Sequence, residues 1–146
     1  MQKVTESYPS ILLHKSSKNQ DHKFPKKVYN DQVQTFDLEE RSFNFAKKVI
    51  DLTEKLPKSD KNKIHSNQIL RSSSSIGANY IEANEGLGTK DFYLRLKIAR
   101  KEAKETRFWL KLIEYSNSDL RYEIKILTDE VTELIKIFSS IINKAR

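Results

Sequence analysis

Polar side chains that could take part in binding or catalysis recur every three or four residues between positions 68 and 82. They are Gln68, Arg71, Ser75, Asn79 and Glu82. On a helix this spacing places them on one face, next to apolar residues that would form a helix–helix contact. Since buried polar groups need hydrogen-bond partners, we expect a structural network that fixes the register of the helices, in which Glu102 and Glu105 pair with Arg71. A ligand-binding or catalytic site is the alternative.

Basic residues form a second pattern between positions 90 and 111. Lysines recur every seven residues, at Lys90, Lys97, Lys104 and Lys111, with Arg100, Lys101 and Arg107 beside them. A helix would gather these side chains into a basic stripe opposite a row of small residues. Such a stripe predicts binding to a polyanion with an affinity that falls steeply with salt, and Tyr93, one turn before Lys97, could stack on a base. The alternative is a solvated helix face without a ligand.

Motifs of metal and nucleophilic catalysis are absent from the sequence. The three histidines, His14, His22 and His65, include no pair at i,i+4, and none follows a Glu by three residues, the spacing used by di-iron bundles. The chain has no cysteine, and hence no thiolate ligand or nucleophile. The turn at residues 86–90 lacks the upstream glycine of a phosphate-binding loop. We therefore expect no catalytic residues, no metal site and no cofactor, and a protein that is not an enzyme.

Length and composition set the class of protein. The chain has 146 residues, 37% hydrophobic and 32% charged, with 27 basic and 20 acidic residues and a net charge of +7. The positive excess lies in residues 1–36 (+3) and 87–116 (+4). Three glycines and three prolines are too few for the turns of an all-β protein, and no apolar run approaches the roughly 18 residues of a membrane span. Without a recognisable secretory signal, we expect a cytoplasmic protein that makes no membrane contact.

The apolar periodicity predicts an all-α protein with four helices after a polar, basic N-terminal arm. Residues 1–36 show no sustained period, and we expect an arm that is disordered or docked on a neighbouring molecule; residues 37–146 form the bundle domain. The first helix starts near Asp37, whose spacing from Glu40 matches a capping box, and Pro57 ends it. The second is expected from Ser59 or Asp60 to about Glu85, and the third from Thr89 as N-cap to about Tyr115. The fourth follows residues 117–119 and runs to near the C-terminus.

Each predicted helix carries apolar rows at helical spacing. The first helix has one row of Phe45, Val49, Leu52 and Leu56 and another of Leu38, Phe43, Ala46 and Ile50, while the third has Phe92, Leu96, Ala99, Ala103, Thr106, Leu110 and Ile113. Because the connections are short, consecutive helices should be antiparallel, which favours an up-down-up-down four-helix bundle. The apolar face of the third helix is wide enough to contact more than one neighbour, which points to an oligomer.

Two motifs resemble those of the bacterial four-helix-bundle family named for the intervening sequence of 23S rRNA genes. The first comprises Gln68, Arg71, Ser75-Ile76, Asn79, Glu82 and Glu85-Gly86, and the second comprises Phe92, Ile98-Ala99, Glu102-Ala103, Glu105-Thr106 and Trp109-Leu110. The resemblance covers about residues 37–145. The sequence departs from the family pattern at Gly86, which is displaced, and in the N-terminal arm.

The resemblance implies a small bundle that assembles into a ring-like homopentamer and has no catalytic activity. Some members are encoded inside intervening sequences of 23S rRNA genes, and a related branch, the accessory variability-determinant proteins of diversity-generating retroelements, binds a reverse transcriptase and nucleic acid through a basic surface. We favour an oligomeric RNA- or DNA-binding bundle that uses the basic stripe. The alternatives are a protein-interaction scaffold, for example an accessory subunit of a retroelement reverse transcriptase, and an enzyme built on the polar residues of the second helix.

Overall fold

The computed structural model describes residues 38–144, which form the predicted four-helix bundle and contain no strand. The helices are α1 (Leu38–Lys55), α2 (Asp60–Asn84), α3 (Thr89–Ser116) and α4 (Arg121–Asn143), and a 3-10 turn, η1 (Ser118–Leu120), precedes α4. The all-α prediction is confirmed. The expected arm over residues 1–36 and the expected cap at Asp37 lie outside the described residues.

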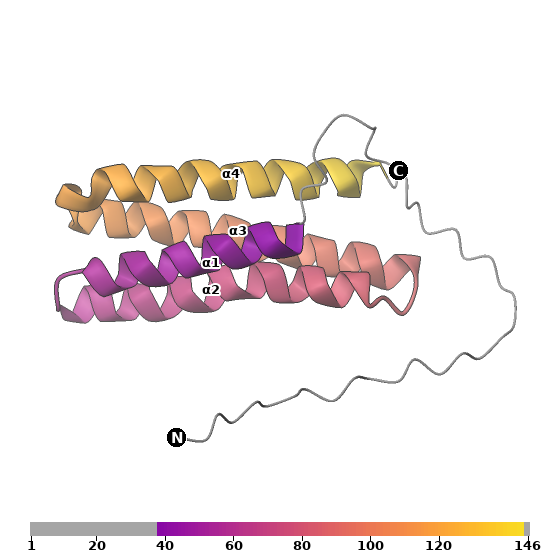
Figure 1. Cartoon of the computed structure of the whole chain (residues 1–146), viewed down its shortest axis with the longest axis horizontal. Helices are drawn as coiled ribbons and strands as arrows, with labels where there is room; N and C mark the ends of the chain where they lie inside the picture. The colour runs from indigo at the N-terminus through magenta and orange to yellow at the C-terminus, as the bar shows by residue number, and fades with distance from the viewer. Residues whose placement is uncertain (1–37, 145–146) are drawn as a thin grey trace, which may run out of the picture.

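The four helices lie side by side, with connections that alternate between the two ends of the bundle (Figure 1). The α2–α3 pair packs most extensively, followed by α3–α4 and α1–α2, whereas α1 and α4 touch least. Near the start of α2, Asn62 is hydrogen-bonded to Asn117, which follows the last residue of α3. In the middle of α2, Ser72 is hydrogen-bonded to Thr106 of α3. Later residues of α2 therefore lie beside earlier residues of α3. Because α3 packs against two neighbours in its own chain, its wide apolar face is used at least in part inside the bundle.

Local sequence signals explain where the helices begin. Ser59 is the N-cap of α2, in an extended conformation, and its hydroxyl accepts a hydrogen bond from the backbone N–H of Asn62 at 3.2 Å. At the start of α3 the prediction of Thr89 as the cap is wrong: Gly88 holds the N-cap position, with φ of 130°, and Thr89 is the first helical residue. The turn requires a backbone conformation that only glycine adopts without strain.

The apolar rows of the helices meet in one core. The fully buried residues include Phe45, Val49, Ile69, Ile76, Leu96, Leu110, Ile113, Ile124, Val131 and Phe138. The predicted row of α3 is buried from Leu96 to Ile113, with Phe92 at its partly exposed end. In the second row of α1, however, Phe43 is 61% exposed and Ile50 is 44% exposed. Within residues 38–144, α1 packs on α2 and α4, and its first row, together with Leu38, covers its core side.

Small residues let α1 approach α2 closely. A Cβ placed at Gly77 would lie 3.3 Å from Cβ of Ser42, a buried residue of α1. Ser72 and Ser73 are also buried, and Ser72 contacts Thr106 of α3. None of the described helices has the length and apolarity needed to cross a membrane.

Candidate nucleic-acid interface

Five lysines of α3 project from the bundle and define what we call the lysine face. They are Lys90, Lys97, Lys101, Lys104 and Lys111, all of them exposed. None forms a salt bridge with another residue of the range 38–144. Their spacing of three, four and seven residues keeps them on one side of the helix.

The carboxylates of α3 do not neutralise the lysine face, because arginines engage them elsewhere. Asp91 pairs with Arg95 on the next turn, at 3.8 Å. The other three acidic residues face arginines of neighbouring segments: Glu102 and Glu105 contact Arg71 of α2, and Glu114 contacts Arg121 of α4. The positive charge that the sequence places in this segment is therefore concentrated on its solvent side.

Two arginines predicted for the basic stripe reach toward α4. Arg100 is half-buried, and its Nη1 donates to Oγ of Ser139 at 3.4 Å. Arg107 is half-buried too, and its Nη1 donates to Oγ1 of Thr132 at 3.5 Å. Both partners belong to α4, so these guanidinium groups follow the border between α3 and α4. The two arginines thus lie beside the lysine face, on the flank nearest α4, and the nucleic-acid-binding role of the seven basic residues stays a prediction.

Two exposed aromatic residues share the lysine face, and sequence reasoning missed both. Phe108 is 53% exposed and Tyr115 is 91% exposed. Tyr93, which the sequence suggested as a stacking residue, is instead half-buried and packs edge-on against Phe92, with ring centroids 5.2 Å apart. Their spacing could have identified them, because Phe108 lies four residues after Lys104 and Tyr115 lies four residues after Lys111, which places each ring on the same side of the helix as the lysine.

The predicted pairing of Arg71 with α3 is present. Arg71 forms ion pairs with Glu102, at 3.4 Å, and with Glu105. Oε1 of Glu105 also accepts a hydrogen bond from Nε1 of Trp109 at 3.2 Å. Burial acts to raise the pKa of Glu105, but the hydrogen bonds from Trp109 and Arg71 and the nearby positive charges outweigh it and lower this pKa. The same carboxylates raise the pKa of Arg71.

The other polar residues of the α2 pattern do not converge on this cluster. Oγ of Ser75 and Nδ2 of Asn79 donate to backbone carbonyls one turn earlier in their own helix, at 2.9 and 2.8 Å. Glu82 pairs with Arg95 at 2.5 Å, and Gln68 is half-buried without a side-chain hydrogen bond to residues 38–144. The expected single network is therefore split into separate contacts along the α2–α3 border.

A buried asparagine pair at one end of the bundle was not anticipated. The Nδ2 groups of Asn62 and Asn117 each donate to Oδ1 of the other residue at 3.0 Å. Asn62 also donates to the carbonyl of Pro57, and Asn117 to the carbonyl of Ile113, both at 2.8 Å. The pair links the α1–α2 connection to the start of α2 and the end of α3. Sequence gave no signal for it, because Asn62 falls in the first turn of a helix where polar residues are ordinary.

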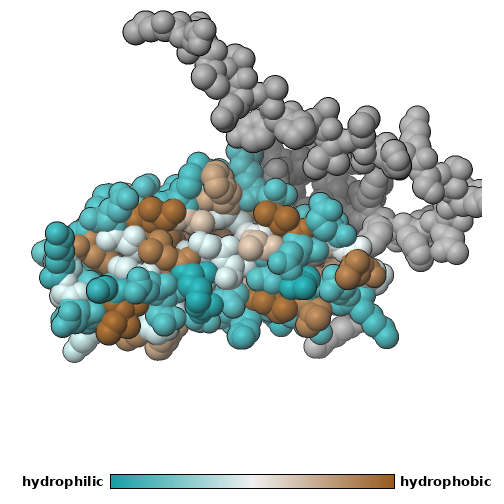
Figure 2. All heavy atoms as spheres, turned by 90° about the horizontal axis from the view of Figure 1, so that it is seen from below, coloured by the Kyte–Doolittle hydropathy of each residue, from teal (hydrophilic) through white to brown (hydrophobic). Residues whose placement is uncertain are grey.

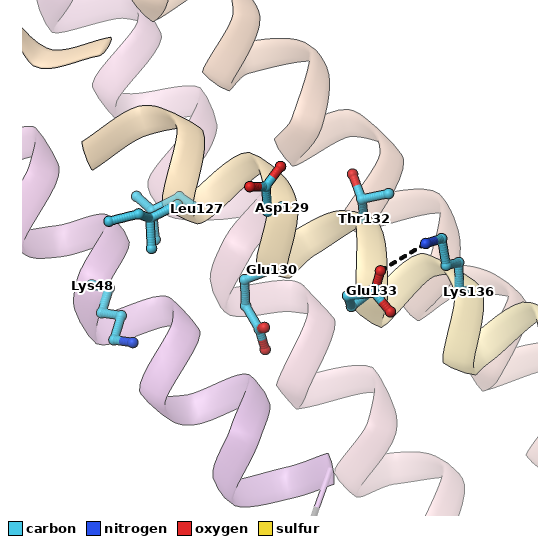
Figure 3. A pocket seen from close by; sticks show the side chains of 8 residues that line it. Lys48, Leu127, Asp129, Glu130, Thr132, Glu133 and Lys136 are labelled. Carbon is cyan, nitrogen blue, oxygen red and sulfur yellow. Dashed lines mark hydrogen bonds and ion pairs between the residues drawn. The ribbon is translucent and has the colours of Figure 1, made fainter. Parts of the chain in front are cut away.

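A shallow hollow lies between α1 and α4, lined by Lys48 and residues of α4 (Figure 3). Its carboxylates all have ion-pair partners. Glu130 binds Arg41 of α1 through two hydrogen bonds of 2.6 and 3.0 Å, Asp129 pairs with Lys125, and Glu133 pairs with Lys136 (Figure 3). The hydrogen bond to Glu130 raises the pKa of Arg41 against the opposing effect of burial. Across this hollow, the ion pair of Arg41 and Glu130 connects α1 to α4, the two neighbouring helices that pack least extensively.

Within residues 38–144, no group of three or more His, Asp or Glu side chains is arranged so that it could hold a metal ion. His65 packs against the ring of Trp109, with centroids 5.9 Å apart. His14 and His22 lie outside the described residues.

Comparison with known proteins identifies the family. The family model described as 23S rRNA-intervening sequence protein matches residues 34–140. Among solved structures, the crystal structure of a protein with unknown function from the S23 ribosomal protein family of Bacteroides thetaiotaomicron is 37% identical, with a TM-score of 0.66, and the match covers 72% of this chain and 97% of that one. No functionally curated protein matches the chain. The two motifs, the four helices and the family match together show that this chain belongs to the 23S rRNA-intervening sequence protein family.

Proposed function

We propose that the protein is a non-enzymatic nucleic-acid-binding bundle that uses the lysine face of α3. The observation that carries the proposal is the separation of charge on this helix. The lysines are exposed and form no salt bridge within residues 38–144, whereas every carboxylate of α3 contacts an arginine. Phosphate groups neutralise such lysines with release of counterions, which is the main source of affinity in protein–nucleic acid complexes.

The proposal includes assembly into a ring-like homopentamer of antiparallel bundles, which is the state that the family resemblance implies. Copies of the lysine face arranged around a ring would act together on one polyanion. Linked sites bind far more tightly than a single site when the ligand can reach several of them. A short oligonucleotide and a long one would then differ strongly in affinity.

The lysine face can be tested by charge reversal. Lys97, Lys101, Lys104 and Lys111 are replaced together by Glu, and binding of a fluorescent RNA is measured by anisotropy across a salt series. We expect the loss of binding at moderate salt and, where binding persists at low salt, a much shallower dependence of log K on log salt, since each phosphate contact contributes about 0.7 to 0.9 to this slope. Far-ultraviolet circular dichroism should show unchanged helicity.

A matched control separates the lysine face from net charge. Replacing four other exposed lysines by Glu, at Lys47, Lys58, Lys61 and Lys63 on α1, its connection and the start of α2, changes the charge by the same amount. This control variant should keep most of the affinity. RNA affinity that is equal in the two variants would overturn the proposal, and the protein-interaction scaffold, with the exposed Phe43 and Ile50 of α1 as its surface, would become the better account.

A further inference from the structure

Aromatic rings and lysines share the exposed side of α3. Starting at Lys97, the positions on this side follow one another at intervals of four, three, four, three and four residues, and they are Lys97, Lys101, Lys104, Phe108, Lys111 and Tyr115. Intervals of three and four keep all six side chains on one line along the helix. Phe108 thus has a lysine one turn away on each side, and Tyr115 stands one turn beyond the last lysine.

Packing within the bundle does not account for either ring. Phe108 contacts Trp109 edge-on, with centroids 5.1 Å apart, yet it remains 53% exposed. Tyr115 is 91% exposed and makes no ring contact or side-chain hydrogen bond with the described part of the chain. Exposed apolar residues are common singly, but these two lie in line with lysines that have no salt bridge to any described residue.

A single-stranded nucleic acid is the ligand whose chemistry matches both features. Its phosphates complement the lysines, and its unpaired bases offer π faces on which aromatic side chains stack. A duplex offers the same phosphates, but its base faces are covered by their neighbours except at the ends. We propose that Phe108 and Tyr115 stack on unpaired bases of a strand whose phosphates are held by Lys101, Lys104 and Lys111. This inference rests on the proposed function and specifies its ligand.

The separation of the two rings indicates how the strand would lie. Seven residues of helix span about 10 Å, whereas stacked bases follow one another at about 3.4 Å along a strand. The rings therefore receive bases that are not neighbours in a continuous stack, and the strand between them must be open. Trp109, the single tryptophan of the chain, touches the ring of Phe108 and can report on a base that arrives there.

The test compares three probes: an unstructured 12-nucleotide RNA, an abasic strand with the same number of phosphates, and a 12-base-pair duplex. The variants are Phe108→Ser and Tyr115→Ser. Their controls are Phe43→Ser on α1 and Tyr122→Ser on α4, which remove exposed rings away from the lysine face. Phe108→Tyr keeps a ring at the same place.

We expect each of Phe108→Ser and Tyr115→Ser to weaken binding of the RNA about tenfold, in the range known for loss of one base–aromatic stack. Binding of the abasic strand and the slope of affinity against salt should not change, Phe108→Tyr should bind like the wild type, and the controls should have no effect. The RNA should quench Trp109 fluorescence, and the abasic strand should not.

Three results would overturn the inference. The first is equal RNA affinity of the wild type and both serine variants, and the second is equal affinity for RNA and duplex with no quenching of Trp109. The third is a change in subunit number of the serine variants at unchanged RNA affinity, which would make this side of α3 a contact between copies. In each case the proposed function would still stand if the wild type binds the abasic strand and the charge-reversal variant does not. If none of the probes binds, both the proposed function and this inference are overturned.

Discussion

The buried asparagine pair gives the sharpest prediction about stability. In the variant Asn62→Ala, three hydrogen bonds disappear: the two that join Asn62 and Asn117, and the one from Asn62 to Pro57. Asn62 is 4% exposed and Asn117 is 8% exposed, so water does not readily replace the lost partners. At about 0.5 to 1.5 kcal/mol for each hydrogen bond, the free energy of unfolding should fall by about 2 to 4 kcal/mol.

The double variant makes the reasoning quantitative. Asn117→Ala also removes three hydrogen bonds, because Asn117 donates to Ile113 as well. Two of the bonds are shared by both single variants, so the double variant loses four bonds and not six. Its cost should therefore be smaller than the sum of the single costs by about 1 to 3 kcal/mol, which is a coupling typical of residues in direct contact.

Urea unfolding followed by circular dichroism, at one protein concentration for all variants, measures these differences. With a slope of about 1 to 3 kcal/mol per molar urea, each single variant should lower the midpoint by about 1 M or more. Asn67→Ala, at an exposed position of the same helix, serves as the control and should change the midpoint little. Additive single costs, or single variants within about 0.5 kcal/mol of the wild type, would refute the reasoning.

Three further predictions concern single contacts, each read as a urea midpoint. The lowered pKa of Glu105 means that its charged form stabilises the folded state. This stabilisation is present above the ordinary carboxyl pKa of about 4.3 and is lost as the pH falls through the lowered pKa. Glu105→Gln should therefore reduce the stability at pH 6, and a loss of stability that is equally large at pH 3 would argue against this. Gly77→Ala should fail to give the gain of about 1 kcal/mol that alanine usually brings to a helix, because its Cβ would lie 3.3 Å from Cβ of Ser42; a full gain would show that α1 yields easily. Thr106→Val should cost about 1 kcal/mol, because it removes the hydroxyl bonded to buried Ser72 at 2.9 Å; an unchanged midpoint would mean that this bond contributes nothing net.

The apolar side chains left on the surface show where sequence patterns stop being informative. Phe43 and Ile50 have the spacing of a core row but are exposed, and Figure 2 shows hydrophobic residues dispersed among hydrophilic ones over the visible face of the bundle. A helical row of apolar residues is equally regular whether or not a neighbour covers it. Only the placement of α2 and α4 decides which row of α1 is buried.

The basic segment shows the same division. Sequence alone located the seven basic residues of the predicted stripe and placed them on α3. The neighbouring helices then decide which remain available: Arg100 and Arg107 reach hydroxyl groups of α4, while the lysines stay exposed. The long, planar guanidinium group favours such directed hydrogen bonds, whereas an ammonium group is more strongly hydrated.

By itself, the sequence determined the four helices, their approximate ends and the main core rows, because these depend on local spacing and on the short connections. The pairing of Arg71 with α3 was also predicted, because these oppositely charged residues lie on consecutive helices joined by a short connection. The tertiary structure decided the partners that are distant in sequence. Asn62 and Asn117 lie 55 residues apart, and their mutual hydrogen bonds exist only because α2 and α3 bring them together. The same packing directs the carboxylates of α3 toward arginines and leaves its lysines and two rings toward solvent, since a contact between helices is fixed by the register of both and not by the pattern of either one.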